Sequence, residues 1–354
     1  MRILMVVHGG FQQNPFVLSM ADGLVKRGHV VVCSLEEFWD SYYKYDLLFF
    51  QWPEAIFDWK RDQIEIERLS GLFHRIKESG VRTVITCHNL HPHNNDPLTI
   101  ALYDFVYSKV DAIHHLGRYS YGLFKEKYPH QYHFIVPHHI ADSLWEKSIS
   151  PSLAKEKLGI PIRDIVVSSF GAFRDSGEIW MFLRMANAVV HKGVSFLAPR
   201  IPGVNFQKGP HFKTTIKYII KRFVFKRTRV KLSGFLSEDE LGVWLSASDI
   251  IFIQRKEILN SGNLPLAFSA GKVVVGPDIG NVGEILKETG NYVFDPNDSV
   301  SVKKAVLSAI NEIKKGNQLG AKNHQYARDN WTVSRVCAQI DKELSMICKS
   351  EILV

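Results

Sequence analysis

The sequence predicts an α/β protein with two parallel, doubly wound sheets. Short apolar segments of strand length alternate with segments of helical periodicity along most of the 354 residues. Strands that are nearly all apolar are typical of parallel sheets, because helices cover both faces of such a sheet. A chain of this length also exceeds the usual size of one hydrophobic core, so two domains are expected.

The N-terminal half shows this alternation from its first residues. The segment "RILMVVH" at 2–8 predicts a strand, and apolar residues at helical spacing predict a helix from Phe16 to Gly28. A second helix is expected over 66–80, where a glycine ends it. Further strands are expected over 29–35, 46–52, 82–88, 111–116 and 134–140.

The pattern loosens over 140–165, where two prolines and many polar residues predict a domain boundary near residue 160. A helix over 237–248 is predicted by the capping pattern from Ser237 to Glu240. The strands of the second half are expected over 165–171, 194–199, 230–236, 249–255, 272–277 and 291–295. We therefore expect Rossmann-like domains at 1–160 and 161–330, and a C-terminal helix within 331–354 that crosses back to the first domain.

Charge and cysteine usage narrow the class of protein. The formal net charge of +8 suggests anionic partners such as sugar nucleotides, phospholipid head groups or nucleic acid. The four cysteines have no metal-site spacing, which argues against a disulfide framework and a structural zinc site. The apolar stretch at the N-terminus is too short for a signal sequence, and no apolar run has the length of a membrane span. We expect a cytoplasmic protein, with contact to the inner face of the membrane as a further expectation.

The segment 257–286 is the first candidate for a binding site. A loop through Asn260, Ser261 and Gly262 leads from a predicted strand into a predicted helix. Small residues before a helix let a phosphate approach its unpaired N–H groups. The alternative is an ordinary helix cap by Asn260 or Ser261, and the segment alone does not decide between the two.

Several motifs in a fixed order resemble a known family. The segments "FGAFR", "GFLSEDELGVWLSASDIIFI", "ILNSGNLPLAFSAGK" and "GPDIGNVGEI" are similar to the C-terminal half of GT-B glycosyltransferases, close to retaining family 4. The N-terminal half resembles a bacterial capsule and exopolysaccharide branch, with "NP" before the first helix, then "WPE", "T-x-HN-x-x-PH" and "VPH". The resemblance covers nearly the whole chain.

This resemblance implies two Rossmann-like domains that face a deep cleft. It further implies transfer of a sugar from a GDP- or UDP-linked donor to a saccharide or lipid-linked acceptor in bacterial polysaccharide biosynthesis. The acceptor would bind 1–160 and the donor 161–330. No metal or other cofactor is expected, because positive side chains and helix N-termini offset the charge of the leaving diphosphate. Nucleic acid is not expected as a partner, since no recognition motif accompanies the basic residues.

The sequence departs from the family at several positions. Two glutamates eight residues apart would fall at Ile258 and Leu266, and neither position is acidic. The usual Lys-Gly pair is replaced by Ser176–Gly177, whereas Arg174 remains. Two alternatives therefore stay open: a non-catalytic sugar-nucleotide-binding or partner subunit, and a sugar-nucleotide epimerase with the same fold.

The predicted donor site combines residues from both halves. Arg174 is expected to hold the diphosphate with its guanidinium, against the alternative of an ordinary surface arginine. Glu284 is expected to bind a ribose or sugar hydroxyl, or else to begin the next helix. The full donor set is Gly9, Gly10, Arg174, Asn260, Ser261, Gly262 and Glu284.

The predicted reaction centre is His88, which ends a strand and lies beside the transferred sugar in the resembling family. An imidazole near its ordinary pKa exchanges a proton at neutral pH, whereas in the resembling family a histidine at this position usually makes a hydrogen bond to the sugar rather than acting as a base. Glu54 is a second candidate to accept a proton. Asn14, Trp52, His91 and His93 are assigned to the acceptor. A metal site at the three histidines, core packing of Trp52 and loop ordering by His91 or His93 are the alternatives.

The segment 211–231 concentrates positive charge between aromatic and aliphatic residues. Such a segment predicts a helix on a membrane surface, which suits a lipid-linked acceptor. The alternative, which we favour on composition, is a helix with a solvated basic face.

Overall fold

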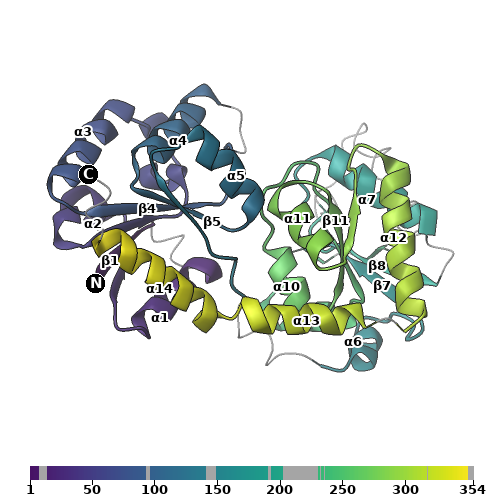
Figure 1. Ribbon diagram of the computed structural model, residues 1–354. Coiled ribbons are helices and arrows are strands. Elements are labelled where there is room, and N and C mark those ends of the chain that lie inside the picture. Colours follow the sequence, from purple (N-terminus) through teal and green to yellow (C-terminus); the bar gives the residue numbers. More distant parts are fainter. Residues whose placement is uncertain are drawn as a thin grey trace. The chain divides into compact units, whose positions relative to one another are not determined.

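The computed structural model describes residues 1–7, 14–92, 96–140, 149–189, 193–201, 230–231, 233–234, 236–316 and 318–349. The chain forms two compact units (Figure 1). Unit 1 comprises Met1–Ala141 and Asn330–Val354, and unit 2 comprises Asp142–Asp329. The chain thus changes units earlier than the expected residue 160.

A buried lysine accounts for this earlier boundary. Helix α6 (Pro151–Lys157) carries Lys155, whose Nζ donates to Asp249 Oδ2 and to the backbone oxygen of Asp164, both at 2.9 Å. Both acceptors precede strands of the second sheet, so α6 is anchored in unit 2 although it lies before residue 160.

Unit 1 contains a parallel sheet of six strands in the order β2-β1-β3-β4-β5-β6. The strands are β1 (Arg2–Val6), β2 (Val30–Cys33), β3 (Leu47–Phe50), β4 (Arg82–Cys87), β5 (Ala112–His115) and β6 (Tyr132–Ile135). The chain leaves β1 toward β2 and returns to β3 on the other side, so the strand order reverses between β1 and β3. Ligands of open α/β sheets bind beside the carboxyl ends of strands at such a switch point.

Helices cover the two faces of this sheet. They are α1 (Pro15–Val25), α2 (Glu36–Asp40), α3 (Ile66–Glu78), α4 (Pro97–Lys109), α5 (Arg118–Lys127) and α14 (Val333–Lys349), with short 3-10 helices η2 (Tyr42–Lys44), η3 (Pro53–Phe57) and η4 (Arg61–Gln63). Asn14 caps α1, because its side chain accepts a hydrogen bond from the backbone N–H of Phe16 at 3.0 Å.

The last helix of the chain completes the core of unit 1. Figure 1 shows α14 in yellow beside the purple α1. Its Val336, Cys337, Ile340 and Leu344 are buried in one cluster with residues of β1. A Cβ atom on Gly23 of α1 would lie 2.3 Å from Cys337 Sγ, so the two helices approach more closely than any larger residue allows.

Unit 2 repeats the design with strand order β12-β11-β10-β7-β8-β9, again all parallel. The strands are β7 (Ile165–Ser168), β8 (Val194–Leu197), β9 (Val230–Lys231), β10 (Ile250–Phe252), β11 (Val273–Pro277) and β12 (Tyr292–Phe294). Here the order reverses between β7 and β10. The predicted α/β class with two parallel sheets is confirmed.

The helices of unit 2 include α6 and six others: α7 (Ser176–Val189), α9 (Glu238–Ala247), α10 (Asn263–Ser269), α11 (Gly280–Glu288), α12 (Ser299–Lys314) and α13 (Leu319–Asn330). The predicted capping pattern of α9 is confirmed. Ser237 Oγ accepts from the backbone N–H of Glu240, and Glu240 Oε2 accepts from that of Ser237.

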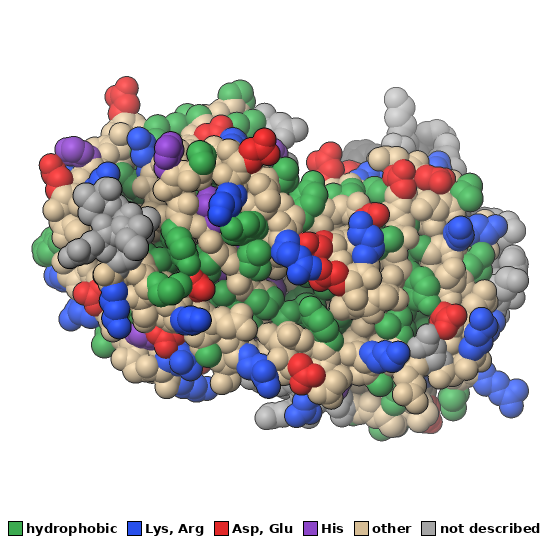
Figure 2. Space-filling model, in the orientation of Figure 1, with side chains coloured by type: hydrophobic (Ala, Val, Ile, Leu, Met, Phe, Trp, Pro, Cys, Tyr) green, Lys and Arg blue, Asp and Glu red, His purple; other side chains and the backbone are tan. Residues whose placement is uncertain are grey.

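The surface carries both signs of charge. On the face shown in Figure 2, Lys and Arg side chains are interspersed with Asp and Glu over the described surface of both units. Residues 211–229 of the predicted basic segment lie outside the described residues, and Val230 and Lys231 form β9. Within the described ranges, no helix combines the length and the apolar character needed to cross a membrane.

Candidate functional site

In unit 1, the predicted residues meet at the carboxyl ends of β3 and β4. His88 follows β4 directly, and its Nε2 lies 3.1 Å from Oε1 of Gln51, the residue after β3. The ring of Trp52 stacks on the imidazole with 4.4 Å between centroids and 18° between planes. Phe16, on the helix that Asn14 caps, meets the same imidazole edge-on at 5.1 Å. The structure thus brings His88, Trp52 and the start of α1 together.

The hydrogen bond to Gln51 fixes which nitrogen of His88 carries the hydrogen. An amide oxygen only accepts, so Nε2 of His88 is the donor and Nδ1 is the acceptor nitrogen of the ring. The amide of Gln51 is oriented accordingly, since its own Nε2 faces Met5 Sδ at 3.9 Å. Gln51 is fully buried and holds this arrangement without competition from water.

Burial keeps the imidazole of His88 neutral. Desolvation lowers the pKa of His88 well below its ordinary value, and the neighbouring His138, His114 and His139 lower it further. The sequence-based expectation of an imidazole that titrates near neutral pH is therefore corrected. A neutral ring with a fixed hydrogen is suited to hydrogen bonding with a hydroxyl group rather than to donating a proton.

Two more histidines extend this cluster. His138 and His139 follow β6, and Phe16 contacts both rings, at 4.5 Å and 4.6 Å between centroids. Burial lowers the pKa of His138 to about 4 and that of His139 to about 3. The structure thus packs both of these rings against Phe16.

Glu54 turns toward helix α4. Its Oε1 accepts a hydrogen bond from the hydroxyl of Tyr103 at 3.0 Å, and its Oε2 is buried without a partner among the described residues. Burial raises the pKa of Glu54 above its ordinary value. Its side-chain hydrogen bond therefore ties η3 to α4, which is different from the predicted contact with an acceptor hydroxyl.

The rest of the predicted acceptor side is only partly described. His91 is exposed in the loop before α4. Asp96, a carboxylate close to the three histidines in the sequence, caps α4 through the backbone N–H of Thr99 and pairs with Arg61. His93, Gly9 and Gly10 lie outside the described residues.

In unit 2, Arg174 links the loops that follow β7 and β10. Its backbone N–H donates to Glu178 Oε2 at 2.8 Å, and its Nη1 donates to the backbone oxygen of Glu257 at 3.1 Å. The side chain is exposed at the carboxyl end of the sheet. Lys256 provides a second positive charge near Arg174. Its Nζ lies 2.1 Å from the position that a Cβ atom on Gly177 would occupy, so the ammonium group packs against this glycine.

The predicted loop before α10 is held by its own side chains. Asn260 Oδ1 accepts a hydrogen bond from Asn281 Nδ2 of α11 at 2.8 Å, and Ser261 Oγ accepts from the backbone N–H of Asn263 at 3.3 Å. The cap position of α10 is Gly262, without a side-chain hydrogen bond, rather than Asn260 or Ser261. Glu284 lies half-buried inside α11.

Sequence reasoning missed an ion pair at this switch point. Arg255 Nη1 lies 2.6 Å from Oε2 of Glu178, a carboxylate that is 2% exposed. Arg255 ends the strand expected over 249–255, but no motif singled it out. The available signal was its position directly after a buried strand, next to the reversal of strand order.

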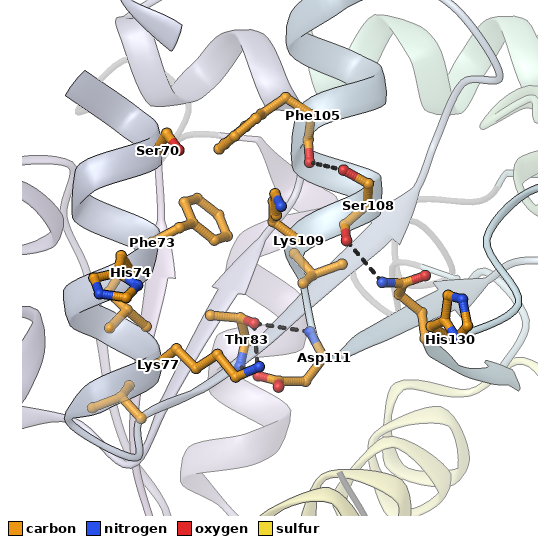
Figure 3. A pocket seen from close by; sticks show the side chains of 14 residues that line it. Ser70, Phe73, His74, Lys77, Thr83, Phe105, Ser108, Lys109, Asp111 and His130 are labelled. Carbon is orange, nitrogen blue, oxygen red and sulfur yellow. Dashed lines mark hydrogen bonds between the residues drawn. The ribbon is translucent and has the colours of Figure 1, made fainter. Parts of the chain in front are cut away.

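A cavity lies in the described part of each unit. The one in Figure 3, of about 550 Å³, lies between α3 and α4, where the rings of Phe73 and Phe105 meet at 5.6 Å. Its floor includes Thr83, whose hydroxyl donates to Asp111 Oδ2 at 2.7 Å. Thr83 is near the start of β4 and His88 follows its end, about 17 Å away at 3.3 Å per residue. This cavity is therefore separate from the predicted reaction centre.

The second cavity, of about 490 Å³, lies in unit 2 between α7 and the start of α12. Gly177 and Lys256 contribute to its lining, so it adjoins the loops that follow β7 and β10.

Known structures share this architecture, although neither a protein-family model nor a curated protein matches the sequence. Sucrose-phosphate synthase from Thermosynechococcus elongatus aligns with a TM-score of 0.76 at 12% identity, over 98% of each chain. HepE from Anabaena in complex with UDP aligns with a TM-score of 0.70 at 14% identity, over 98% of this chain and 100% of HepE. Starch synthase IV from Arabidopsis thaliana gives 0.67 at 10% identity, over 99% of each chain. The chain has the GT-B fold of these glycosyltransferases.

Proposed function

We propose that this protein is a glycosyltransferase that moves a sugar from a nucleotide diphosphate sugar to a saccharide or lipid-linked saccharide. The observation that carries the proposal is the neutral His88, held by Gln51 and stacked on Trp52 at the carboxyl ends of the strands. The fold supports it, since solved structures of HepE with this fold contain UDP and UDP-glucose. UDP is accordingly the first nucleotide to test.

The chemistry that this site offers is recognition of a sugar. Because the hydrogen of the imidazole is directed at Gln51, Nδ1 is the acceptor nitrogen of the ring, and an acceptor of this kind complements the O–H of a sugar hydroxyl. The stacked indole and imidazole form a rigid aromatic surface of the kind that packs against a sugar face. In unit 2, the exposed Arg174 offers positive charge to a leaving diphosphate, which lowers the cost of breaking the bond between the sugar and the diphosphate.

A role in bacterial polysaccharide assembly at the inner face of the membrane is part of the proposal. It is supported by the ordered N-terminal motifs. The non-catalytic subunit is the second candidate, because Ile258 and Leu266 replace the glutamates of related enzymes.

A product assay separates these functions. The protein is incubated with UDP-glucose, UDP-galactose, UDP-N-acetylglucosamine and GDP-mannose, with and without a panel of oligosaccharide acceptors. Release of the nucleoside diphosphate that depends on an acceptor supports transfer. Conversion of one sugar nucleotide into its epimer supports an epimerase. Binding without turnover across the panel supports the non-catalytic subunit and contradicts the proposal.

A thermal-shift comparison of UDP, GDP, ADP and dTDP identifies the nucleotide. A ligand that binds the folded state raises the melting temperature by mass action. We expect the largest shift with UDP. A chain whose melting temperature responds to none of the four contradicts the assignment of a nucleotide donor.

A further inference from the structure

We propose that Arg255, together with Asn263 and Gln254, forms an anion-binding cradle over Gly171 that holds the diphosphate of the donor. The inference rests on the proposed function and deepens it. It places the principal diphosphate contact on Arg255, in the loop after β10, a residue that lies outside the quoted sequence motifs.

The three side chains converge on one glycine. Arg255 Nη2, Asn263 Nδ2 and Gln254 Nε2 each lie 3.1 Å from the position that a Cβ atom on Gly171 would occupy. Gly171 follows β7, and Gln254 and Arg255 follow β10, so the three nitrogen atoms meet where the strand order of the sheet reverses. The absence of a side chain at Gly171 is what allows them to meet.

A buried carboxylate holds the guanidinium in place. Arg255 Nη1 donates to Glu178 Oε2 at 2.6 Å and to the backbone oxygen of Ala172 at 2.7 Å. The side chains of Arg255 and Glu178 are 12% and 2% exposed. One edge of the planar fork is therefore fixed by the protein, so little conformational freedom is lost when the other edge binds an anion.

The opposite edge keeps its donors. Within the described residues, neither Arg255 Nη2 nor Asn263 Nδ2 makes a hydrogen bond to the protein. Gln254 donates to the backbone oxygen of Gly171 at 2.8 Å, which aims its amide at the same place. Two oriented donors with no protein acceptor, one of them charged, match the oxygens of a phosphate group.

The charges around Arg255 favour an anion as the missing partner. Burial lowers the pKa of Arg255, Glu178 opposes that shift, and Arg174 and Arg200 lower the pKa further. Glu178 is already committed to Arg255 and to the backbone N–H of Arg174. The side chain of Asp175 is also engaged, since it accepts from the backbone N–H of Glu178. A diphosphate would relieve the repulsion among the three guanidinium groups.

The test compares variants by calorimetric titration with UDP and UMP. Arg255→Gln should weaken UDP binding about tenfold or more, because a charge-assisted hydrogen bond is lost, and should change UMP binding much less. Arg255→Lys, which keeps the charge but loses the fork, should fall between Arg255→Gln and the unchanged protein. Arg163→Gln is the matched control, since Arg163 is exposed at the amino end of β7.

Gly171→Ala provides a second test of the cradle that does not depend on whether Arg255→Gln folds. Arg255→Gln leaves Glu178 buried without its partner, so circular dichroism must show that it folds. Gly171→Ala removes no charge and places a methyl group where the three nitrogen atoms meet, and it should weaken UDP binding to a similar extent. UDP affinities within twofold of the unchanged protein in both variants would overturn the inference.

A titration with inorganic pyrophosphate separates this inference from the proposed function. One outcome is that the protein binds none of the four nucleoside diphosphates but binds pyrophosphate, and that Arg255→Gln abolishes pyrophosphate binding. This outcome would support the cradle and contradict the proposed function. A protein that binds UDP equally well in all variants retains the proposed function and loses the cradle. Failure to bind both pyrophosphate and UDP overturns both.

Discussion

The Nε2 atom of His88 lies 3.1 Å from Oε1 of Gln51, so a fully buried amide on one strand end fixes the hydrogen of an imidazole on the next. Gln51 is thus a positioning residue for the candidate reaction centre. We expect Gln51→Leu to lower kcat by about tenfold to a hundredfold, because a buried donor left without its acceptor costs about 1–3 kcal/mol. The dissociation constant for UDP should stay nearly unchanged, and Gln51→Glu, which restores an acceptor, should recover part of the turnover.

Gln63→Leu provides the control for this measurement, since Gln63 is exposed in η4. Steady-state kinetics with UDP-glucose give kcat and KM separately. Equal losses of turnover and of UDP affinity in Gln51→Leu would indicate general damage to unit 1 instead of a positioning role.

His88→Ala tests the imidazole itself. Loss of a preorganised hydrogen bond at the reacting sugar is expected to lower kcat by about a hundredfold. The affinity for UDP should change little, because the nucleotide is assigned to unit 2. His130→Ala is the control, since His130 is exposed at the amino end of β6. A parallel loss of UDP binding in His88→Ala would move the histidine from the sugar to the nucleotide.

A buried pair of histidines predicts acid sensitivity of unit 1. His115 Nε2 lies 2.9 Å from His133 Nδ1, and His133 Nε2 donates to the backbone oxygen of Tyr128. Burial lowers the pKa of His115 to about 2, and it also lowers the pKa of His133. Folded-state values below the unfolded value of about 6.5 mean that the unfolded chain binds more protons in acid.

Stability should therefore be complete above about pH 6.5 and fall as the pH decreases toward the folded-state values. Between pH 6.5 and pH 5, His115 contributes a loss of about 1.7 kcal/mol in the free energy of unfolding, and His133 adds to it in the same direction. Urea titrations at a series of pH values measure this slope, which should be shallower in His115→Gln. The exposed His74 supplies the comparison variant His74→Gln. Identical slopes in all three proteins would exclude the pair as the cause.

The contact between α1 and α14 predicts the effect of a small substitution. A Cβ on Gly23 would meet Cys337 Sγ at 2.3 Å and Val333 Cγ1 at 3.0 Å. Gly23→Ala should therefore lower the free energy of unfolding by about 1–3 kcal/mol, although alanine favours a helix more than glycine does. Cys337→Ala removes the obstructing sulfur, and thermal melts of the double variant should show partial recovery. The exposed Gly122→Ala in α5, where a Cβ meets nothing within 4 Å, should stabilise or leave the melt unchanged.

The strands and the helix caps were predictable from the sequence because their causes are local. Apolar runs such as that of β3 follow from burial on both faces, and Ser237 with Glu240 satisfies its own helix end. The transition at residue 141 was not predictable, because it depends on Lys155 reaching Asp249, far away in the sequence. Local sequence patterns therefore predict elements that local interactions stabilise, but not contacts between residues far apart in the sequence.

The candidate site was predictable in position but not in chemistry. Strand ends placed His88 and Trp52 together, since parallel strands share a carboxyl edge. The neutral state of His88 arises from burial beside His114 and His138, which sequence alone does not reveal. Glu54 accepts a hydrogen bond from Tyr103, and Arg255 donates one to Glu178. Both partners lie on helices that are distant in the sequence, so the sequence alone does not predict these contacts.

Because α14 belongs to unit 1, the core of unit 1 can be completed only after unit 2 has been synthesised. Val336, Cys337, Ile340 and Leu344 belong to the core of unit 1, yet they leave the ribosome after all of unit 2. Unit 2 is one continuous segment and has every strand of its sheet before the last helix is made. The apolar face of α1 therefore stays uncovered in the nascent first domain while the second domain folds. Chaperones can bind to this face during that time.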